Sequence, residues 1–414
     1  MIIILIIQSI IVYAKESFIL MISEDFMESI EGNTRLLVPA ASLTQKVPPK
    51  TPAFFNPAAK LNRDISILLY RTFISECKRH TKTFADAFSG IGARALRVAV
   101  EVPEMENIYL NDINILAIEA AKKAAELNGV EEKCYYSSNE VCKFLTQHST
   151  KNGERFTIID LDPFGTPAPF IDCVLRSILD GGLISITATD TTVLCGIYPV
   201  ICCRRYYGRS LNTNYTNEIA LRLVISLIAL TAARLDLAIE PIFVHTNLQY
   251  LRIYVKVFVS SSKANKVYDN IGYLRHCFRC GNRNVVERYI MSEVCDICGN
   301  SFSVAGQMWI NKLFDKDFIG RLVSHEPINN GTQGKHMMDR SKKLLSICMD
   351  ELDDIPFYFR GDEIASKLRI NPYSLQTVIE KLSASGYRAS KTSFNPSAFK
   401  TNARIDEILD VLRK

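Results

Sequence analysis

The chain has 414 residues, which is long enough for two domains of ordinary size. Hydrophobic residues make up 48% of it and charged residues 22%, so the composition excludes an intrinsically disordered protein. The formal net charge of +5 is too small to identify a polyanionic partner, although residues 200–300 hold 13 Lys and Arg against 7 Asp and Glu.

The first twelve residues are almost entirely apolar, but they lack the basic start and the small-residue cleavage site of a signal peptide. They are also too few to cross a bilayer, which takes about 20 residues. We interpret residues 1–22 as an extension upstream of the true start at Met21 or Met27. A short buried strand or a membrane anchor is the alternative. No later segment resembles a transmembrane helix, so the sequence predicts a cytoplasmic protein with no membrane partner.

The first half of the chain alternates between strand and helix patterns. Prolines mark residues 31–60 as an extended arm, and apolar residues at helical spacing follow over 61–80. The alternation predicts an α/β fold with a parallel sheet and helices on both faces. The expected strands and helices, in turn, cover 82–87, 93–101, 107–111, 114–128, 133–137, 140–148, 156–160, 167–180 and 183–189.

The second half begins with a helix at 215–235 and two strand-like runs within 237–259. An insert rich in cysteine follows at 273–302, and a helix is expected at 337–351. Residues 362–400 show the rhythm of a helix-turn-helix with a wing, for which a generic pair of packed helices is the alternative.

A glycine turn follows the first strand of the alternating region. Gly90 and Gly92 let the backbone approach a ligand without a Cβ clash, and the next helix presents free N–H groups. Asp112 ends the following strand, where a doubly wound fold holds ribose hydroxyls. The G-x-G-x-x-G pattern of dinucleotide binding is not completed, which favours S-adenosylmethionine. Arg94 can pair with the methionine carboxylate through its planar fork; an ordinary surface arginine is the alternative.

A loop of acid, proline and aromatic residues follows the buried strand 156–160. Such a strand end is where ligands bind in an open parallel sheet. The Asp162 carboxylate can accept hydrogen bonds from an exocyclic amine, whose lone pair is conjugated into the base, and can assist proton departure during methyl transfer. Pro163 fixes a backbone angle, and Phe164 offers a face to a flipped-out base. A purely structural turn is the alternative.

A series of motifs in unbroken order over residues 28–405 resembles the tRNA (guanine-N2)-dimethyltransferases. The resemblance implies a class I (Rossmann-like) methyltransferase fold that uses S-adenosylmethionine. It also implies that guanine at position 26 of tRNA is methylated once and then again. The motifs are Asn56-Pro57, Leu61–Asp64, Asp86–Arg94, Leu110–Asp112, Asp160–Gly165, Thr187–Asp190, Leu194–Gly196, Phe394–Pro396 and Lys400-Thr401.

The resemblance also implies residue roles, with Asp162 as the catalytic aspartate. Glu140 and Val141 fall where the family holds the adenine, usually with Asp-Ala. The chain departs from the family again at Ala58, where family arms often carry arginine after the proline. The cofactor-binding residues expected from the turn and from the family together are Arg63, Asp86, Gly90, Gly92, Arg94, Asp112, Glu140 and Val141.

Four cysteines form two C-x-x-C pairs with fourteen residues between them, and each pair is followed by glycine. This spacing predicts a zinc ribbon in which four thiolates hold one structural Zn²⁺. His276, beside the first pair, is expected to be a surface histidine and not a ligand. The four ligands are Cys277, Cys280, Cys295 and Cys298.

Basic residues mark candidate contacts with RNA. In the cysteine segment, Arg275, Arg279, Arg283 and Arg288 interleave with Tyr273, Phe278 and Tyr289. Elsewhere the candidates are Arg204, Arg205 and Arg209 with Tyr206 and Tyr207, and Lys391 and Lys400 in the tail. A basic patch at a helix end is the alternative.

We therefore expect a methyltransferase domain with its arm at 23–265, a zinc-ribbon insert and linker at 266–335, and a C-terminal α/β domain that binds tRNA at 336–414. No obligate protein partner is evident from the sequence. Two other functions remain open: a DNA amino-methyltransferase acting on adenine or cytosine, and a non-catalytic zinc-ribbon protein that binds RNA.

Overall fold

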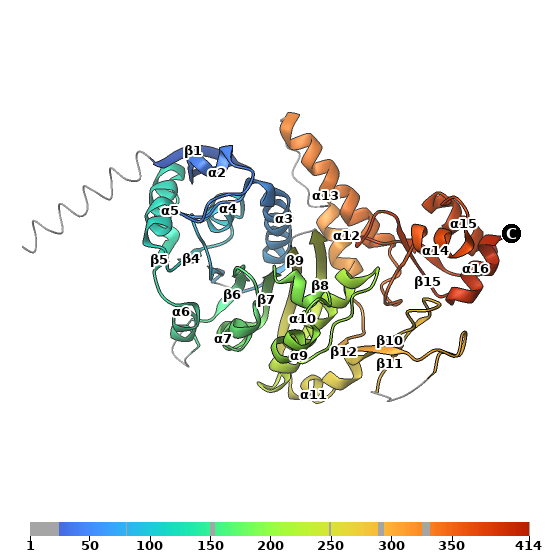
Figure 1. Ribbon diagram of the computed structural model, residues 1–414. Coiled ribbons are helices and arrows are strands. Elements are labelled where there is room, and N and C mark those ends of the chain that lie inside the picture. Colours follow the sequence, from blue (N-terminus) through green and yellow to red (C-terminus); the bar gives the residue numbers. More distant parts are fainter. Residues whose placement is uncertain are drawn as a thin grey trace, which may run out of the picture. The chain divides into compact units, whose positions relative to one another are not determined.

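The computed structural model describes residues 25–79, 81–149, 154–247, 250–288, 294–324 and 332–413, with only the backbone for 332–339 (Figure 1). The expected extension 1–22, the candidate start Met21 and the candidate contact Tyr289 lie outside the described residues. Contacts divide the described chain into two compact units, one that holds the residues up to Asp162 and the described part of His325–Met337, and one that holds Pro163–Ser324 and Met338–Lys414. The division falls directly after Asp162, the expected catalytic aspartate. The predicted domain boundaries, at 265/266 and 335/336, were instead placed where the amino-acid composition changes.

The first unit has the alternating strands and helices that the sequence predicts. Four parallel strands lie in the order β5-β4-β3-β6. The elements are β1 (Phe26–Glu31), β2 (Thr34–Pro39), α2 (Ala40–Thr44), η1 (Pro57–Ala59), α3 (Lys60–Glu76), β3 (Thr83–Asp86), α4 (Ala93–Glu101), β4 (Asn107–Asn111), α5 (Ile115–Asn128), η2 (Glu131–Lys133), β5 (Cys134–Ser137), α6 (Val141–Gln147) and β6 (Phe156–Leu161).

Local signals set the helix boundaries in this unit. The Asn114 side chain accepts hydrogen bonds from the first N–H groups of α5, and Gly129 ends the helix with φ +62°. The β1–β2 hairpin, which the sequence did not predict, packs on α4 and α5 and lies over them in Figure 1. Every residue of β3 and β6 is buried, and the acids near their carboxyl ends, Asp86 and Asp160, belong to the site below.

The second unit contains an antiparallel sheet in the order β7-β9-β8 and a three-stranded ribbon in the order β11-β10-β12. Its elements up to Ser324 are η3 (Ala168–Phe170), α7 (Ile171–Ser177), β7 (Ile178–Ala188), α8 (Thr191–Leu194), α9 (Pro199–Tyr206), α10 (Thr216–Ala233), β8 (Leu237–Asn247), β9 (Tyr250–Val259), α11 (Ser261–Ala264), η4 (Val267–Asn270), β10 (Ile271–His276), β11 (Arg283–Val286), β12 (Ser303–Trp309) and α12 (Lys316–Ser324).

One predicted helix of this unit is shorter than expected, and another helix, α10, is unusually apolar. The helix predicted over 167–180 ends at Ser177, because β7 begins at Ile178 and the following Gly181, with φ +71°, and Gly182 disfavour helix. Among the described residues, α10 is long and apolar enough to cross a membrane, yet 78% of that segment is buried inside the protein. A helix that is apolar on all sides suits a core position, and α10 packs on β8, β9 and β12.

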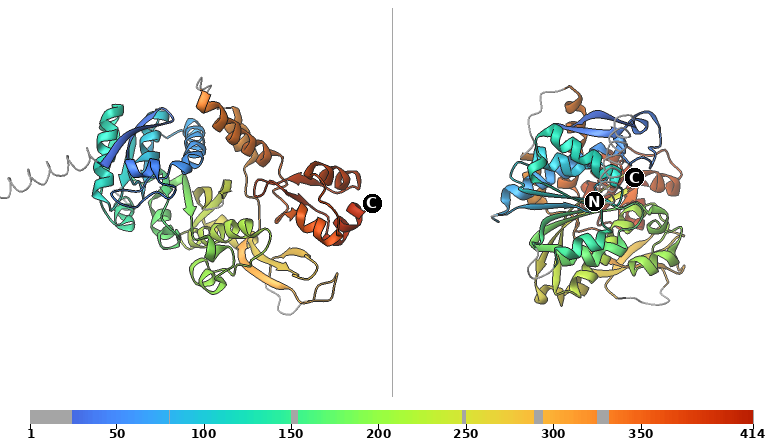
Figure 2. Two further views of the ribbon diagram at one scale, coloured as in Figure 1. Left: turned by 45° about the horizontal axis from the view of Figure 1, so that its top comes forward. Right: turned by 90° about the vertical axis from the view of Figure 1, so that its left-hand side faces the viewer.

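The C-terminal part has the helix-turn-helix order that the sequence predicts, followed by a short antiparallel hairpin. Phe359, Ile364, Leu382, Phe399 and Ile408 belong to one buried apolar cluster. The left view of Figure 2 shows this part in orange and red. Its elements are α13 (Thr332–Asp350), β13 (Phe359–Arg360), α14 (Gly361–Leu368), α15 (Leu375–Ala384), β14 (Ala389–Lys391), β15 (Ala398–Thr401) and α16 (Ile405–Arg413).

Candidate active site

The carboxyl ends of the parallel strands hold the glycine turn and its acid. Gly90 and Gly92 have φ angles of +53° and +75°, which favour glycine. A Cβ atom on Gly92 would lie 2.9 Å from Leu110 Cδ2, so the turn packs closely on β4. The Gly90 N–H donates to Asp112 Oδ2 at 2.8 Å, and the Asn114 N–H donates to Oδ1 at 2.8 Å. The turn and Asp112 therefore form one rigid corner, where a doubly wound fold holds a nucleoside.

Asn111 connects this corner to the loop after β5. Its Nδ2 donates to the carbonyl oxygens of Ala87 and Asn139 at 3.2 and 3.1 Å, and its Oδ1 accepts the Asn139 N–H at 3.1 Å. Glu140 and Val141, the expected adenine contacts, thus reach the same sheet edge. Val141 is buried, and the Glu140 carboxylate caps α6 by accepting the Lys143 N–H at 3.0 Å. Their contact with an adenine stays a prediction.

Asp162 is tied to this edge by an arginine. Arg94 Nη2 lies 2.9 Å from Asp162 Oδ2, and Arg94 Nη1 lies 2.6 Å from Asp160 Oδ1. Arg94 is 6% exposed and also donates to Asn62 Oδ1 at 3.4 Å, while Tyr70 donates to the other oxygen of Asp160. The guanidinium is thus engaged by two protein carboxylates, and the alternative of an ordinary surface arginine is wrong because Arg94 is buried. Contact of Arg94 with the methionine carboxylate stays a prediction.

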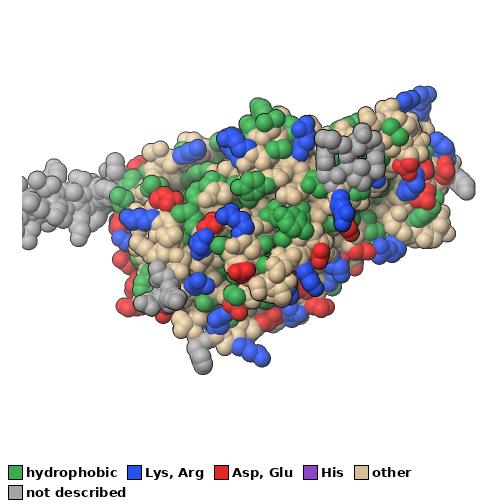
Figure 3. Space-filling model, turned by 90° about the horizontal axis from the view of Figure 1, so that it is seen from below, with side chains coloured by type: hydrophobic (Ala, Val, Ile, Leu, Met, Phe, Trp, Pro, Cys, Tyr) green, Lys and Arg blue, Asp and Glu red, His purple; other side chains and the backbone are tan. Residues whose placement is uncertain are grey.

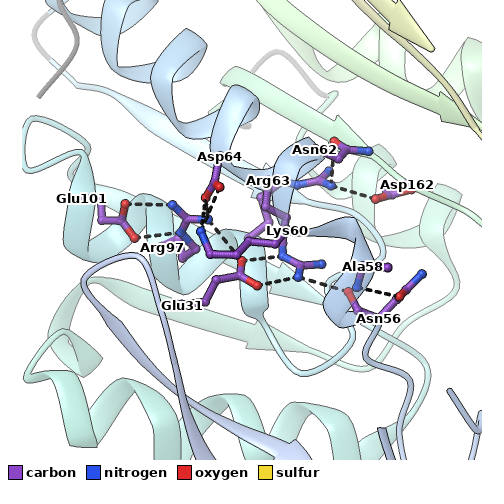
Figure 4. A network of polar contacts seen from close by, with 11 residues as sticks. Glu31, Asn56, Ala58, Lys60, Asn62, Arg63, Asp64, Arg97, Glu101 and Asp162 are labelled. Atoms are coloured by element: carbon purple, nitrogen blue, oxygen red, sulfur yellow. Dashed lines mark hydrogen bonds and ion pairs between the residues drawn. The ribbon is translucent and has the colours of Figure 1, made fainter. Parts of the chain in front are cut away.

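Arg63 belongs to a second buried network, which Figure 4 shows. Its Nε and Nη2 donate to the two oxygens of Glu31 at 2.6 and 2.5 Å, and Nη2 also donates to the Asn56 carbonyl at 3.1 Å. Arg97 continues the network by pairing with Glu31 at 3.1 Å and with Asp64 at 2.6 Å. In this arrangement Arg63 links α3 to the β1–β2 hairpin through Glu31 and to the arm through Asn56. Cofactor contact by Arg63 stays a prediction.

The remaining predicted residues lie at strand ends or in the following loop. Asp86 ends β3 and is 3% exposed. In the second unit, Pro163 is buried and Phe164 is 63% exposed, as a stacking surface requires. The loop is fixed there because the Gly165 N–H donates to Thr189 Oγ1 at 2.7 Å and the Thr189 N–H donates to the Gly165 carbonyl at 2.8 Å.

The four cysteines of the ribbon meet at one point. Their Sγ atoms all lie within 4.8 Å of one another, with Cys277 to Cys298 at 3.4 Å and Cys280 to Cys295 at 3.5 Å. Zinc held by four sulfurs at about 2.3 Å in a tetrahedron requires sulfur separations of about 3.8 Å. The Asn282 N–H also donates to Cys280 Sγ at 3.4 Å, directly after Gly281, whose φ is +84°. The donor set therefore fits a structural zinc ion.

The prediction of a surface histidine next to this site is wrong. His276 is 6% exposed and its Nδ1 lies 2.8 Å from the Tyr215 hydroxyl. Burial and the nearby charges of Arg283 and Lys367 lower the pKa of His276 to about 3. Arg283 is also not at the surface: its side chain is 3% exposed, pairs with Glu363 at 2.7 Å and lies over the Tyr215 ring. It is a core residue and not an RNA contact.

Most of the other candidate RNA contacts lie on the surface. Arg204, Arg209 and Lys391 are exposed, and Arg205 is half-buried with Nη1 3.4 Å from Asp190 Oδ2. Tyr207 is also exposed, but the prediction for Tyr206 is wrong because its side chain is fully buried. In the ribbon, Arg288 is exposed, Arg275 donates to Asn284 and Arg279 donates to Asn300. Contact of these side chains with RNA stays a prediction.

The prediction that Lys400 contacts RNA is wrong. It is fully buried, and its Nζ lies 3.3 Å from Glu218 Oε1 and 3.0 Å from Glu351 Oε1. A lysine that neutralises two buried carboxylates is not available to a phosphate. We therefore remove Lys400 from the RNA-contacting residues.

Comparisons with known proteins identify the family of the chain. The family model described as N2,N2-dimethylguanosine tRNA methyltransferase matches residues 32–413. A tRNA (guanine(26)-N(2))-dimethyltransferase of Methanothermobacter thermautotrophicus is 36% identical over 384 residues, covering 92% of this chain and 97% of the relative. A tRNA (guanine(26)-N(2)/guanine(27)-N(2))-dimethyltransferase of Aquifex aeolicus is 32% identical, covering 92% and 94%.

A solved structure shares the whole fold. It is the complex of Trm1 from Pyrococcus horikoshii with S-adenosyl-L-methionine, with a TM-score of 0.80 and 28% sequence identity, covering 93% of this chain and 99% of that one. The likeness confirms the predicted α/β methyltransferase fold. The chain therefore belongs to the N2,N2-dimethylguanosine tRNA methyltransferase family.

Proposed function

We propose that this protein transfers methyl groups from S-adenosylmethionine to the exocyclic N2 amine of guanine at position 26 of tRNA, and that it does so twice to give N2,N2-dimethylguanosine. The observation that carries the proposal is the Asp162 carboxylate, held by Arg94 at the same sheet edge as the Gly90–Asp112 corner. The family membership agrees with this substrate and cofactor.

The roles of the residues follow from their positions. Gly90, Gly92 and Asp112 fit the nucleoside part of the cofactor, and Phe164 offers an exposed ring to the extruded guanine. Arg94 engages Oδ2 of Asp162, which leaves Oδ1 to accept a hydrogen bond from the guanine N2 amine. S-adenosylmethionine, when bound, supplies an electrophilic methyl group on its sulfonium sulfur.

The chemistry assigned to Asp162 is positioning and proton acceptance. A hydrogen bond from N2–H to the carboxylate shifts electron density toward the amine nitrogen, which then forms the new N–C bond as the C–S bond breaks. The displaced N2 proton goes to the carboxylate and from there to solvent. A monomethylated amine still carries one N–H, so the same carboxylate can serve the second transfer.

The test is a transfer assay with labelled S-adenosylmethionine. Its substrates are an unmodified tRNA transcript, the same transcript with adenosine at position 26, and duplex DNA. We expect label only in the first, and nucleoside mass spectrometry should identify N2,N2-dimethylguanosine. Transfer to DNA alone would establish the other enzyme class, and transfer to neither would leave a protein that only binds RNA.

We also infer that the enzyme works in the cytoplasm, where its substrate would be encountered.

A further inference from the structure

Helix α9 carries a stripe of mostly apolar side chains that faces solvent instead of the core. Val200, Cys203, Arg204 and Tyr207 are exposed and lie at positions i, i+3, i+4 and i+7, which is one face of a helix. Val200 is 74% exposed and Tyr207 is 61% exposed. The opposite side of α9 is buried. The stripe therefore has the spacing of a contact face without a partner in the described structure.

The loop that leads into α9 extends this stripe. Ile197 is 56% exposed and Tyr198 is 52% exposed. Single exposed apolar residues are common, but several in one short segment usually mark a binding surface. Figure 3 shows one side of the molecule on which hydrophobic side chains lie among basic and acidic ones. We call Ile197, Tyr198, Val200, Arg204 and Tyr207 the α9 face.

The backbone of Tyr207 supports a functional reason for its exposed ring. The residue ends α9 with φ +55°, a left-handed conformation in which glycine is usual and bulky residues are rare. Glycine follows only at the next position, where a Cβ would lie 2.4 Å from the Gln307 carbonyl oxygen. The chain thus keeps a tyrosine where glycine would be less strained, although the ring gains little packing. Strained residues of this kind concentrate at functional sites.

The charges around the α9 face identify the class of partner. No Asp or Glu occurs between Thr191 and Asn217, a segment that holds Arg204, Arg205 and Arg209. A segment whose charged residues are all arginines, with exposed aromatic rings beside them, suits RNA, because bases stack on tyrosine and phosphates pair with arginine. A protein partner or a second copy of the chain would not need this one-sided charge.

The α9 face is attached to the catalytic loop by its buried side. The Tyr206 hydroxyl is 2.7 Å from Thr166 Oγ1 and donates to Asp190 Oδ1 at 2.7 Å. Thr166 follows the loop that carries Phe164. Tyr206 is fully buried, and burial and the Asp190 charge raise its pKa, so it remains a hydroxyl donor at neutral pH. RNA on the α9 face would therefore lie about one helix diameter, roughly 10 Å, from the loop that is proposed to receive the guanine.

We propose that the α9 face binds the tRNA nucleotides adjacent to the methylated guanine, with Tyr198 and Tyr207 stacking on bases or riboses and Arg204 pairing with a phosphate. The proposal rests on the proposed function, because it specifies how the same substrate is held. It assigns tRNA contact to apolar and aromatic residues of α9 in addition to its arginines.

The experiment uses the full-length protein and an unmodified tRNA transcript. The variants are Tyr207→Gly, Tyr198→Ala/Tyr207→Gly and Val200→Ser, with Val259→Ser as the matched control because Val259 is 58% exposed on β9. The measurements are KM for tRNA, KM for S-adenosylmethionine, kcat, the tRNA dissociation constant and the thermal midpoint. We expect the double variant to raise KM and the dissociation constant for tRNA about tenfold or more, with KM for the cofactor unchanged.

The thermal midpoint separates contact from structure. Tyr207→Gly relieves the left-handed conformation, so its thermal midpoint should equal or exceed that of the wild type while tRNA binding weakens. Unchanged tRNA binding in the double variant overturns the proposal. So does a change of oligomeric state without a change in tRNA binding, which would make the α9 face a protein interface. A wild type that transfers no methyl group would defeat the proposed function alone, because the dissociation constants still decide the role of the α9 face.

Discussion

Arg94 Nη2 lies 2.9 Å from Asp162 Oδ2, while Nη1 of the same guanidinium lies 2.6 Å from Asp160 Oδ1. One buried cation therefore joins the proposed catalytic carboxylate to the fully buried end of β6. Because Arg94 is on the first turn of α4, the position of Asp162 depends on the same helix that follows the glycine turn. Cofactor corner and catalytic loop are thus coupled through a single side chain.

Replacing Arg94 should destabilise the fold as well as stop catalysis. Arg94→Met leaves the Asp160 carboxylate buried without its cation, and breaking a buried pair in this way costs about 3–5 kcal/mol. Urea denaturation would measure the free energy of unfolding. Arg176→Met, which removes an exposed pair with Asp172, is the control and should change stability little. Equal stability of Arg94→Met and the wild type would show that the pair is not formed.

Replacing Asp162 should affect the chemical step and leave cofactor binding nearly intact. Asp162→Ala removes the proposed proton acceptor, so kcat should fall by about 10²–10⁴-fold or more. Isothermal titration with S-adenosylmethionine should give an affinity close to that of the wild type, and Asp172→Ala should behave like the wild type in both assays. If Asp162→Ala instead lost the cofactor, the loop would have been assigned the wrong role.

The alternating elements were predictable because periodicity and glycine turns are local signals. The strand at 107–111 and the helix at 93–101 match the structure at both ends. Asp162 was predictable because it follows a buried strand. The two partners of Arg94 could not be predicted, because Asp160 and Asp162 lie 66 and 68 positions away from it in the chain. One signal could have indicated it: Asp160 interrupts an apolar strand, and a buried carboxylate requires a partner.

The main error of the sequence-based predictions was to place three basic side chains at the surface that the structure shows to be buried. His276, Arg283 and Lys400 were expected at the surface, which is where charged residues usually lie. Each is instead buried against a side chain from a distant segment, such as Tyr215 for His276 and Glu363 for Arg283. Single-sequence patterns do not report such pairings.

Removing zinc should unfold the ribbon and weaken what packs on it. The purified protein should contain one zinc ion per chain, and Cys280→Ser should lose it, as measured by elemental analysis. Arg283 of the ribbon pairs with Glu363 of α14, so loss of the metal should lower the thermal midpoint by about 5 °C or more. Cys77→Ser is the control. A protein of unchanged stability with no bound metal would contradict a structural zinc.

Stability should fall in acid because of two buried glutamates. Burial alone would raise the pKa of Glu31, but Arg63 and Arg97 outweigh it and the pKa is lowered below its ordinary value of 4.5; for Glu218, Lys400 and Arg222 do the same. A lowered pKa in the folded state means that the stabilisation is fully present above pH 4.5. It is lost as the pH falls through the folded-state pKa.

Unfolding experiments between pH 3 and pH 6 would measure this effect. Glu31→Gln should lower stability at pH 6 and flatten its decline in acid, whereas the exposed Glu132→Gln should leave the curve unchanged. A decline equally steep in Glu31→Gln and in the wild type would remove Glu31 from the explanation.

Lys400 should prove structural and not RNA-binding. Lys400→Met leaves Glu218 and Glu351 without their shared cation, so the free energy of unfolding should fall by about 3 kcal/mol. At a temperature where the variant is still folded, its dissociation constant for tRNA should match that of the wild type. The exposed Lys391→Ala should show the opposite behaviour, with normal stability and weaker tRNA binding. Weaker tRNA binding by folded Lys400→Met would restore the original prediction.

The ion pair between Glu218 and Lys400 also constrains how the protein can be made. The two residues are 182 positions apart, and the glutamate lies on the apolar helix at the centre of the second unit. During synthesis α10 leaves the ribosome long before its lysine exists. A shortened chain that ends before β15 would therefore keep an acid in its interior with one counter-charge missing. Translation has to pass Lys400 before the charges of this core are balanced.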